Sequence, residues 1–423
     1  MAPRLKSRAH APRGASGSGE AHAWPPIALE PRVWQSAVRA GSRADRLFRS
    51  YESALVPRIA SRTPGLGARA IASLSEATAA IAALDAAAEL DVGPLWSQML
   101  RSESVASSKI ENIYTRQEEL AAALAGARAS KAARDVAAHV DAIERLVRAA
   151  ETGAIATGDI LRAHSALLAA DAVEGAHAGR FRTVQNWIGG SDETPRDALY
   201  VPPAAAHVEP LMNDLVDFVA RDDLPPVVQA AIAHAQFETI HPFTDGNGRI
   251  GRALVHAIMR RRKLTSRTIV PVATALLADP EVYFDGLTLF RLEGDVEGFV
   301  ELFSARAAIA AVESRVAARD LIALPGRWRE EARPRRGSMM GMLFDVLVEQ
   351  PVIDVEKICA LTGSTPRAAY DVIEKLEALA ILKEITNRKR DRLWSAPDVF
   401  EIIDSLEKRI GRRKLPRLRG TRR

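Results

Sequence analysis

Cysteine is almost absent from this chain, because Cys359 is the only one among 423 residues. No disulfide can form within the chain, and a reducing compartment such as the cytoplasm is the expected location. We also identify no apolar run of membrane-spanning length, so no contact with a membrane is expected. Residues 1–23 are basic, rich in Ala, Gly and Ser, and lack the apolar centre of a signal peptide. They predict a disordered basic tail, with a transit peptide as the alternative.

An excess of one charge is also lacking over most of the chain, although the formal net charge is +5. Nine of the 58 basic residues follow Glu407 without an intervening acid, which leaves 49 basic against 53 acidic residues elsewhere. The basicity therefore belongs to the C-terminal tail, residues 406–423. Such a tail either contacts nucleic acid or an acidic surface, or is a solvated chain end.

Runs of β-branched residues are scarce, whereas Ala is abundant and hydrophobic residues make up 47% of the chain. This composition predicts a mainly α fold with well-filled cores. At about 150 residues per domain, the length predicts roughly three domains. The predicted parts are an N-terminal helical region (24–125), a helical core (126–315), a helix end with a charged linker (316–337) and a C-terminal domain (338–405).

The most informative segment is residues 241–252, His-Pro-Phe-Thr-Asp-Gly-Asn-Gly-Arg-Ile-Gly-Arg. Apolar residues recur at helical spacing on both sides of it, which predicts a tight loop between two core helices, the second starting near Arg249. Gly246 and Gly248 permit backbone conformations closed to other residues, and their amides can form a positive concavity with the start of the next helix. Asn247, Arg249 and Arg252 can donate to phosphate oxygens there.

Two further residues of this segment supply chemistry beyond anion binding. His241 has the side chain most ready to accept a proton near neutral pH. Asp245 offers an oxygen ligand to a hard cation that bridges phosphates. A base, a metal ligand and a phosphate cradle are the parts needed to attack a polyphosphate.

The segment resembles the signature of the Fic family, His-x-Phe-x-Asp/Glu-Gly-Asn-Gly-Arg-x-x-Arg, and matches it at every defined position. The resemblance implies a helical Fic core and transfer of AMP from ATP to a Ser, Thr or Tyr hydroxyl of a protein, with release of pyrophosphate. It implies that His241 deprotonates that hydroxyl and that Asp245 holds Mg²⁺ or Mn²⁺. It also implies that residues 246–249 cradle the phosphates, that Arg252 engages the γ-phosphate and that Phe243 anchors the loop in the core.

A second segment resembles a regulatory motif of the same family. Ser107-x-x-x-Glu111-Asn112 is similar to the inhibitory motif Ser/Thr-x-x-x-Glu-Gly/Asn, within a helical pattern that includes Trp96 and Leu100. The resemblance implies that Glu111 pairs with Arg252, where a carboxylate competes with phosphate for the guanidinium. The alternative is an ordinary solvated helix face that ends in an Asn cap.

Between these segments, residues 179–190 alternate weakly and end in two glycines, and residues 199–203 end in two prolines. This pattern predicts a small β-hairpin. It resembles the Fic flap, whose edge is thought to align a target chain by strand addition. A plain surface hairpin is the alternative.

The C-terminal domain shows a pattern of three helices and two strands. Residues 339–349 predict a helix, Asp354 caps a second helix that ends at Leu361, and Pro366 begins a third that reaches Ala380. Residues 382–385 and 392–395 predict two strands around a basic turn. The arrangement resembles a winged helix-turn-helix, for which weak DNA contact is expected through four basic residues: Arg367, Arg388, Lys389 and Arg390. The third helix is also acidic, so an oligomer or partner module, including a homodimer, is the alternative.

The sequence therefore predicts an autoinhibited protein adenylyltransferase whose substrates are ATP and a protein with a target hydroxyl, including the chain itself. One alternative is a DNA-binding regulator whose Fic domain senses nucleotide. Others are a transferase of another nucleotide or of phosphocholine, and an enzyme that removes AMP with Glu111 orienting a water molecule.

Overall fold

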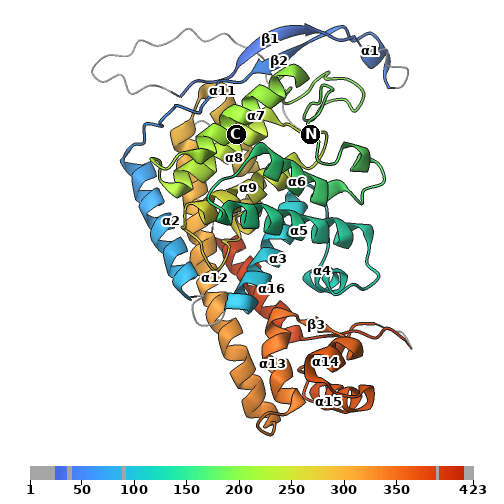
Figure 1. Cartoon of the computed structure of the whole chain (residues 1–423). Coiled ribbons are helices and arrows are strands. Elements are labelled where there is room, and N and C mark those ends of the chain that lie inside the picture. The colour runs from blue at the N-terminus through green and yellow to red at the C-terminus, as the bar shows by residue number, and fades with distance from the viewer. Residues whose placement is uncertain (1–23, 36–40, 88–91, 387–389, 414–423) are drawn as a thin grey trace.

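The computed structural model describes residues 24–35, 41–87, 92–386 and 390–413, and the chain is mainly helical, as predicted (Figure 1). The helices of the first half are α1 Arg43–Arg46, α2 Ala68–Ala87, α3 Val92–Ile110, α4 Gln117–Leu124, α5 Lys131–Glu151, α6 Thr157–Leu168 and the 3-10 helix η1 Glu174–His177. Those of the second half are α7 Ala205–Ala220, α8 Pro226–Ile240, α9 Asn247–Arg261, α10 Val272–Leu277, α11 Pro280–Glu293, α12 Val296–Ala332, α13 Met339–Glu349, α14 Val355–Thr362, α15 Pro366–Ala378 and α16 Pro397–Arg412. The strands are β1 Ala28–Val33, β2 Ser50–Leu55, β3 Val352–Ile353, β4 Lys383–Glu384 and β5 Trp394–Ser395.

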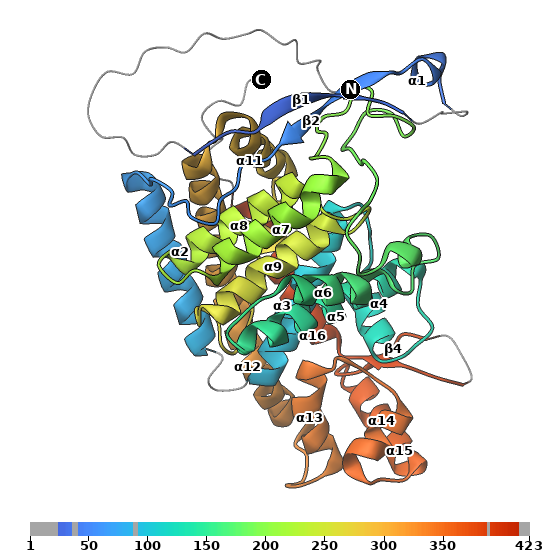
Figure 2. The same cartoon turned by 45° about the horizontal axis from the view of Figure 1, so that its top comes forward.

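Helices α8 and α9 form the centre of the molecule, with the 241–252 segment between them. Every residue of α8 after Pro226 is buried, including polar residues such as Gln229, His234 and Glu238. Its alanines let α7, α9 and α12 approach closely, and α5 and α6 cover α9 (Figures 1 and 2). The loop between α8 and α9 is thus attached at both ends to the most buried helices of the fold.

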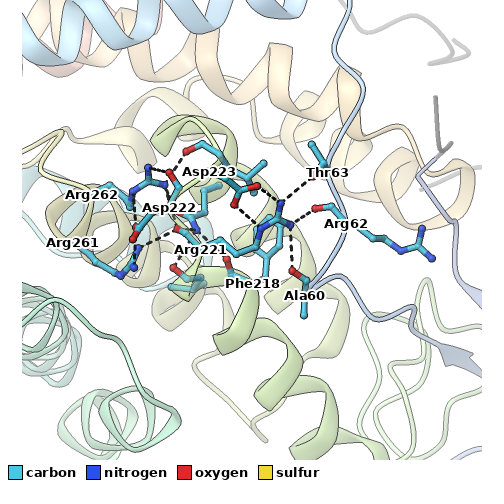
Figure 3. Close-up of polar contacts among 12 residues, drawn as sticks. Ala60, Arg62, Thr63, Phe218, Arg221, Asp222, Asp223, Arg261 and Arg262 are labelled. Carbon is cyan, nitrogen blue, oxygen red and sulfur yellow. Dashed lines mark hydrogen bonds and ion pairs between the residues drawn. The ribbon is translucent and has the colours of Figure 1, made fainter. Parts of the chain in front are cut away.

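The far end of α9 is fixed by a network of arginines (Figure 3). Arg261 and Arg262 both pair with Asp222, at 3.0 and 3.4 Å, and donate to carbonyls at the end of α7. Arg221 donates to the carbonyl of Ala60 over 3.2 Å, which joins α7 to the segment before α2. Cations at the C-terminal end of α9 also interact favourably with its dipole. The network therefore holds the helix that begins at the phosphate-cradle motif.

Helix α12 continues to Ala332, so the helix end predicted at the start of 316–337 is confirmed, whereas the charged linker predicted for 327–337 is wrong over 327–332. The buried Trp328 explains this, because its Nε1 donates to Asp398 over 2.8 Å and its ring packs on Phe344. The charges of this stretch lie on the solvated side of a helix. Helix α2 packs along α12. Contrary to the sequence analysis, α2 has the length and apolar composition of a membrane span, by those criteria alone and among the described residues.

The N-terminal region was predicted to be helical, but it begins with a two-stranded antiparallel sheet. Strands β1 and β2 pair from Ala28 opposite Leu55 to Val33 opposite Ser50. Asp45, just before β2, accepts hydrogen bonds from Thr194 and Arg196 at 2.9 and 3.0 Å. The sheet is thereby tied to the segment that was predicted as a flap.

Helices α13, α14 and α15 and strands β4 and β5 lie where the sequence predicted helices and strands, whereas β3 and α16 were not predicted. The side chain of Asp354 caps α14, Gly363 ends it in the left-handed conformation, and Pro366 opens α15. Strands β3, β5 and β4 form an antiparallel sheet in that order. Helix α16 continues to Arg412 and packs on α12, so the predicted start of a tail at residue 406 is wrong.

Candidate active site

The loop between α8 and α9 is shaped by two residues with positive φ. His241 ends α8 with φ 50°, and Gly246 precedes α9 with φ 78°. At Gly246 a side chain would also meet Leu167, with only 2.8 Å between its Cβ and Cδ2 of Leu167. The sequence predicted a backbone conformation closed to other residues at Gly248, but Gly248 has ordinary helical geometry within α9. Its missing side chain instead leaves room for the carboxylate of Glu111, which a Cβ would displace.

Asn247 and Phe243 hold the loop in shape from inside. The Asn247 side chain accepts from the Phe243 N–H and donates to the Phe243 carbonyl, both over 2.8 Å. Both ends of this amide are therefore engaged by the loop itself, and its predicted donation to phosphate stays a prediction. The buried Phe243 ring stacks on His164, with 3.7 Å between centroids. Phe243 thus anchors the loop as the family resemblance implied.

His164 was not identified from the sequence, although it bridges three segments. Its Nε2 contacts the carbonyl of Asp245 at 3.1 Å, while its Nδ1 accepts from the Gly179 N–H over 3.0 Å. Burial lowers the pKa of His164 to about 4, so the ring is neutral at neutral pH and can serve both contacts. No sequence signal marks it, because a histidine on an apolar helix face is usually just part of the core.

His241 lies at the C-terminal end of α8 with its ring mostly buried. Burial, followed by the charges of Arg291 and Arg182, lowers the pKa of His241 to about 3. Its Nδ1 is 4.0 Å from the carboxylate of Glu238, which lies one turn earlier. The imidazole is therefore neutral at neutral pH, the state that a proton acceptor requires.

Arg182 is a second residue that sequence reasoning missed. It is buried, and its Nε donates to the carbonyl of His241 over 2.9 Å. The predicted flap hairpin around it contains a single antiparallel bridge, between Ile188 and Tyr200. Side-chain bonds hold the rest of this segment, including Asn186 Nδ2 to the Phe243 carbonyl over 2.9 Å.

Asp245 and Arg249 lie at the opening of the loop. The Asp245 side chain is 54% exposed, and Arg249 donates to it over 3.0 Å. Arg249 is otherwise buried, and its Nε has no hydrogen-bond partner among the described residues. A buried guanidinium with an unpaired N–H, beside the free amides that open α9, is well suited to an anion.

Arg252 contacts the segment that resembles the inhibitory motif, as the resemblance implied. Its Nε donates to Ser107 Oγ over 2.8 Å, and its Nη2 donates to the Ser107 carbonyl and to Glu111 Oε1 over 2.9 and 2.8 Å. Asn112 follows the end of α3 with φ 61°, so it turns the chain away after Glu111. The alternative, a plain solvated face, is excluded because Ser107 is fully buried.

A carboxylate behind Arg252 was also missed. Glu238 is buried, and burial raises its pKa to about 7, against the opposing charge of Arg252. Its Oε1 has no hydrogen-bond partner, and a Cβ on Gly251 would meet it at 2.8 Å. Glu238 therefore lies between the base and the guanidinium of this site.

Helix α3 is held against the site by the C-terminal elements. Gln98 donates to the Val348 carbonyl over 2.7 Å, and Arg101 donates to the Glu349 carbonyl over 3.0 Å. On its other side, the buried Glu103 accepts from His256 of α9 over 2.8 Å. The position of Glu111 thus depends on packing with α9 and with α13.

Two of the four predicted DNA-contacting residues belong to the described part of the chain. Arg367 is exposed at the start of α15 and Arg390 is exposed after the turn, while Arg388 and Lys389 lie outside the described residues. A groove of about 1010 Å³ separates α4 from the β4–β5 strands and the start of α15. Glu118 and Glu119 of α4 line it. Two carboxylates in this groove disfavour a DNA phosphate backbone there.

Within the described residues, no three His, Cys, Asp or Glu side chains are grouped so that they could hold a metal ion by themselves. The half-exposed carboxylate of Asp245 fits a different arrangement. Mg²⁺ keeps few protein ligands and is commonly bound by one or two carboxylates together with substrate phosphates. Asp245, beside the start of α9, offers one carboxylate of this kind.

Comparison with known proteins agrees with this geometry. Protein adenylyltransferase fic-1 of Caenorhabditis elegans is 35% identical over 150 residues, which are 34% of this chain and 26% of that protein. Protein adenylyltransferase Fic of Nematostella vectensis is 33% identical over 143 residues, 33% of this chain and 30% of that protein. The chain thus spans about a quarter to a third of the length of these curated relatives.

A solved structure extends the likeness in fold. A Fic family protein from Desulfovibrio desulfuricans aligns with a TM-score of 0.52 at 22% identity, over 78% of this chain and 97% of that one. Residues 154–259 match the Fic/DOC family, and residues 71–148 match the Fic/DOC family N-terminal region. The first match contains the loop and the second contains Glu111. These two segments of the chain carry its likeness to the Fic/DOC family.

Proposed function

We propose that this chain is an autoinhibited protein adenylyltransferase, which moves AMP from ATP to a Ser, Thr or Tyr hydroxyl of a protein or of itself. One observation carries the proposal. The carboxylate of Glu111 lies against Gly248 at the start of α9 and is bound by Arg252, where the resemblance places phosphates. A negatively charged side chain in an anion cradle is what inhibition by competition requires.

The residues of the loop support a balanced transfer step. His241 accepts the proton of the target hydroxyl, whose oxygen forms a bond to the α-phosphorus. The bond from that phosphorus to the bridging oxygen breaks, and pyrophosphate leaves with the electron pair. The approach of the triphosphate adds negative charge near His241, which raises its low pKa toward the range useful for a base.

The other residues bind and orient the nucleotide. The amides that open α9, with Arg249, hold phosphate oxygens, and Arg252 receives the γ-phosphate once Glu111 has moved. Asp245 would hold Mg²⁺ or Mn²⁺, which when bound neutralises charge on the phosphates. Catalysis by this arrangement is mainly positioning and charge stabilisation.

Isotope position distinguishes this reaction from phosphoryl transfer. We expect Glu111→Gly protein to incorporate label from ATP labelled at the α-phosphate and none from ATP labelled at the γ-phosphate. The mass of the modified peptide should rise by that of an adenylyl group. Incorporation of γ-label, or of neither label, would contradict the proposed function. Glu118→Gly on α4 is a matched control, because that carboxylate lies in the groove and not in the cradle.

We further propose that residues 338–405 form a winged-helix module of a cytoplasmic protein, which binds DNA weakly and serves mainly as a partner module. The groove, whose lining carries acidic residues such as Glu118 and Glu119 beside basic ones such as Arg116 and Lys383, supports the second role. The lone Cys359 supports the location. The full chain should bind mixed-sequence duplex DNA weakly, with an affinity that falls steeply as salt rises. Tight, salt-insensitive and sequence-selective binding would instead favour the DNA-binding regulator.

A further inference from the structure

Arg182 is a buried cation whose side chain donates only to main-chain carbonyls in the described part of the chain. It is 3% exposed. Its Nε donates to the carbonyl of His241 over 2.9 Å, its Nη1 to that of Val184 over 3.1 Å, and its Nη2 to that of Pro203. Its own N–H donates to the carbonyl of Pro242 over 2.9 Å. Burying a charge without a carboxylate is costly, so the bonds it makes need an explanation.

One set of these bonds fixes the end of α8. The carbonyls of Ile240 and His241 belong to the last turn, whose carbonyls lack helical partners, and Arg182 reaches both, at 3.5 and 2.9 Å. His241 itself has φ 50°, an uncommon conformation for a non-glycine residue that its surroundings must maintain. A guanidinium at a helix C-terminus also interacts favourably with the dipole. Arg182 therefore supports the backbone from which the imidazole projects.

The other set of bonds fixes the flap, defined here as residues 184–203. Val184 begins it and Pro203 ends it, so both of its ends are bound to one guanidinium. The planar fork of arginine holds five donors on three nitrogens in fixed directions, whereas the three donors of a lysine ammonium share one nitrogen on a flexible stem. The flap and the end of α8 are thus both hydrogen-bonded to the Arg182 side chain.

We propose that Arg182 is a positioning residue that aligns His241 with a target hydroxyl held on the flap. The proposal rests on the proposed function, in which His241 takes the proton of that hydroxyl. A misplacement of about 1 Å between reacting groups can cost on the order of a hundredfold in rate. Because Arg182 holds both the backbone of His241 and the flap, it keeps the two reacting groups from being misplaced relative to each other.

The charge of Arg182 has a second effect on the same residue. Burial and the charge of Arg291 on α11 lower the pKa of His241, and Arg182 adds to them, while Glu238 on α8 is the carboxylate that faces the ring. Loss of the Arg182 charge should therefore raise the pKa of His241 toward its ordinary value. Lysine at position 182 keeps the charge and loses the fork, so charge and geometry can be separated.

The test compares Arg182→Lys and Arg182→Gln in the Glu111→Gly background, with Arg180→Gln as the control because Arg180 is exposed on the same segment. Both Arg182 variants should lose kcat for self-adenylylation by on the order of a hundredfold. Their KM for ATP should stay near that of the parent, because the phosphates are held by α9. The control should match the parent in both quantities.

Two measurements do not need activity. Hydrogen exchange over residues 184–203 should quicken in both Arg182 variants and not in the control. The pKa of His241, followed by NMR titration and assigned with His241→Ala, should rise in Arg182→Gln and stay low in Arg182→Lys.

Unchanged kcat and exchange in both variants would overturn the proposal. So would a rise in the KM for ATP in step with the loss of rate, or loss of cooperative melting in both variants, since either result indicates a structural role alone. An inactive Glu111→Gly parent would contradict the proposed function, and the exchange and titration would still decide the role of Arg182.

Discussion

Nη2 of Arg252 on α9 donates to Oε1 of Glu111, which lies in the turn just after α3, over 2.8 Å. The two partners differ in exposure, since the Arg252 side chain is 3% exposed and that of Glu111 is 37% exposed. The guanidinium is therefore fixed and the carboxylate is the partner that can leave. A hydrogen bond to a charged group contributes about 1.5–3 kcal/mol, less at a partly exposed site, so a modest signal is enough to break it.

His241→Ala should lower adenylyl transfer by about a hundred- to ten-thousandfold, as expected for loss of a general base. ATP affinity should change little, because the loop and α9 hold the phosphates. Initial rates and calorimetric ATP binding in the Glu111→Gly background would measure both, with the exposed His177→Ala as the control. Near-full transfer by His241→Ala would remove this residue from the mechanism.

Asp245→Asn should weaken ATP binding in the presence of Mg²⁺ or Mn²⁺ by about tenfold, which corresponds to about 1.4 kcal/mol. In excess chelator the variant and the parent should bind ATP equally, since the carboxylate then has no cation to hold. The exposed Asp320→Asn on α12 serves as the control. Full transfer in chelator by the parent would show that no divalent cation is needed.

Glu238 makes stability depend on pH, because its pKa is raised by burial from 4.5 to about 7. A carboxyl with a raised folded-state pKa contributes its stability below about pH 4.5 and loses it as pH rises through about 7. Relative to the parent, Glu238→Gln should gain about 3 kcal/mol in free energy of unfolding between pH 4.5 and pH 8. Urea unfolding at both pH values, with exposed Glu76→Gln as the control, would measure this. The same difference in free energy of unfolding between variant and parent at both pH values would contradict this prediction.

Arg101 holds the first half of α3 to the end of α13, through its bond to the Glu349 carbonyl. Arg101→Ala should raise basal transfer above that of the parent but below that of Glu111→Gly, because the helix that leads to Glu111 is loosened. Hydrogen exchange over residues 102–110 should quicken. The exposed Arg148→Ala on α5 is the control. If hydrogen exchange quickened while the basal transfer rate stayed unchanged, the contact between α3 and α13 would have no part in inhibition.

Parts of the fold that depend on neighbours in the chain were predictable from the sequence. The caps at Asp354, Gly363 and Pro366 placed α14 and α15 to within two residues, since each acts through local backbone geometry. The 241–252 segment likewise placed the loop between two buried helices. The contact between Glu111 and Arg252 came from the family resemblance, because the two residues are 141 positions apart.

Features set by distant packing were not predictable. Residues 327–337 were interpreted as a linker because they are charged, yet Trp328 binds Asp398 and α12 stays helical to Ala332. Arg182 and His164 act on main-chain atoms, which leave no mark in a residue pattern. The interpretation of Gly248 was wrong for a similar reason, since its need for a missing side chain arises from Glu111 just after α3.

A double-mutant cycle tests most directly the claim that Glu111 inhibits by occupying Arg252. Initial rates of self-adenylylation would be measured for the parent, Glu111→Gly, Arg252→Ala and the double variant under one set of conditions. We expect Glu111→Gly to be faster than the parent and the double variant to fall back toward inactivity, because the freed guanidinium is then missing. The two effects should not be additive, as expected for residues that act through one contact. A double variant as fast as Glu111→Gly, or a Glu111→Gly no faster than the parent, would contradict the account.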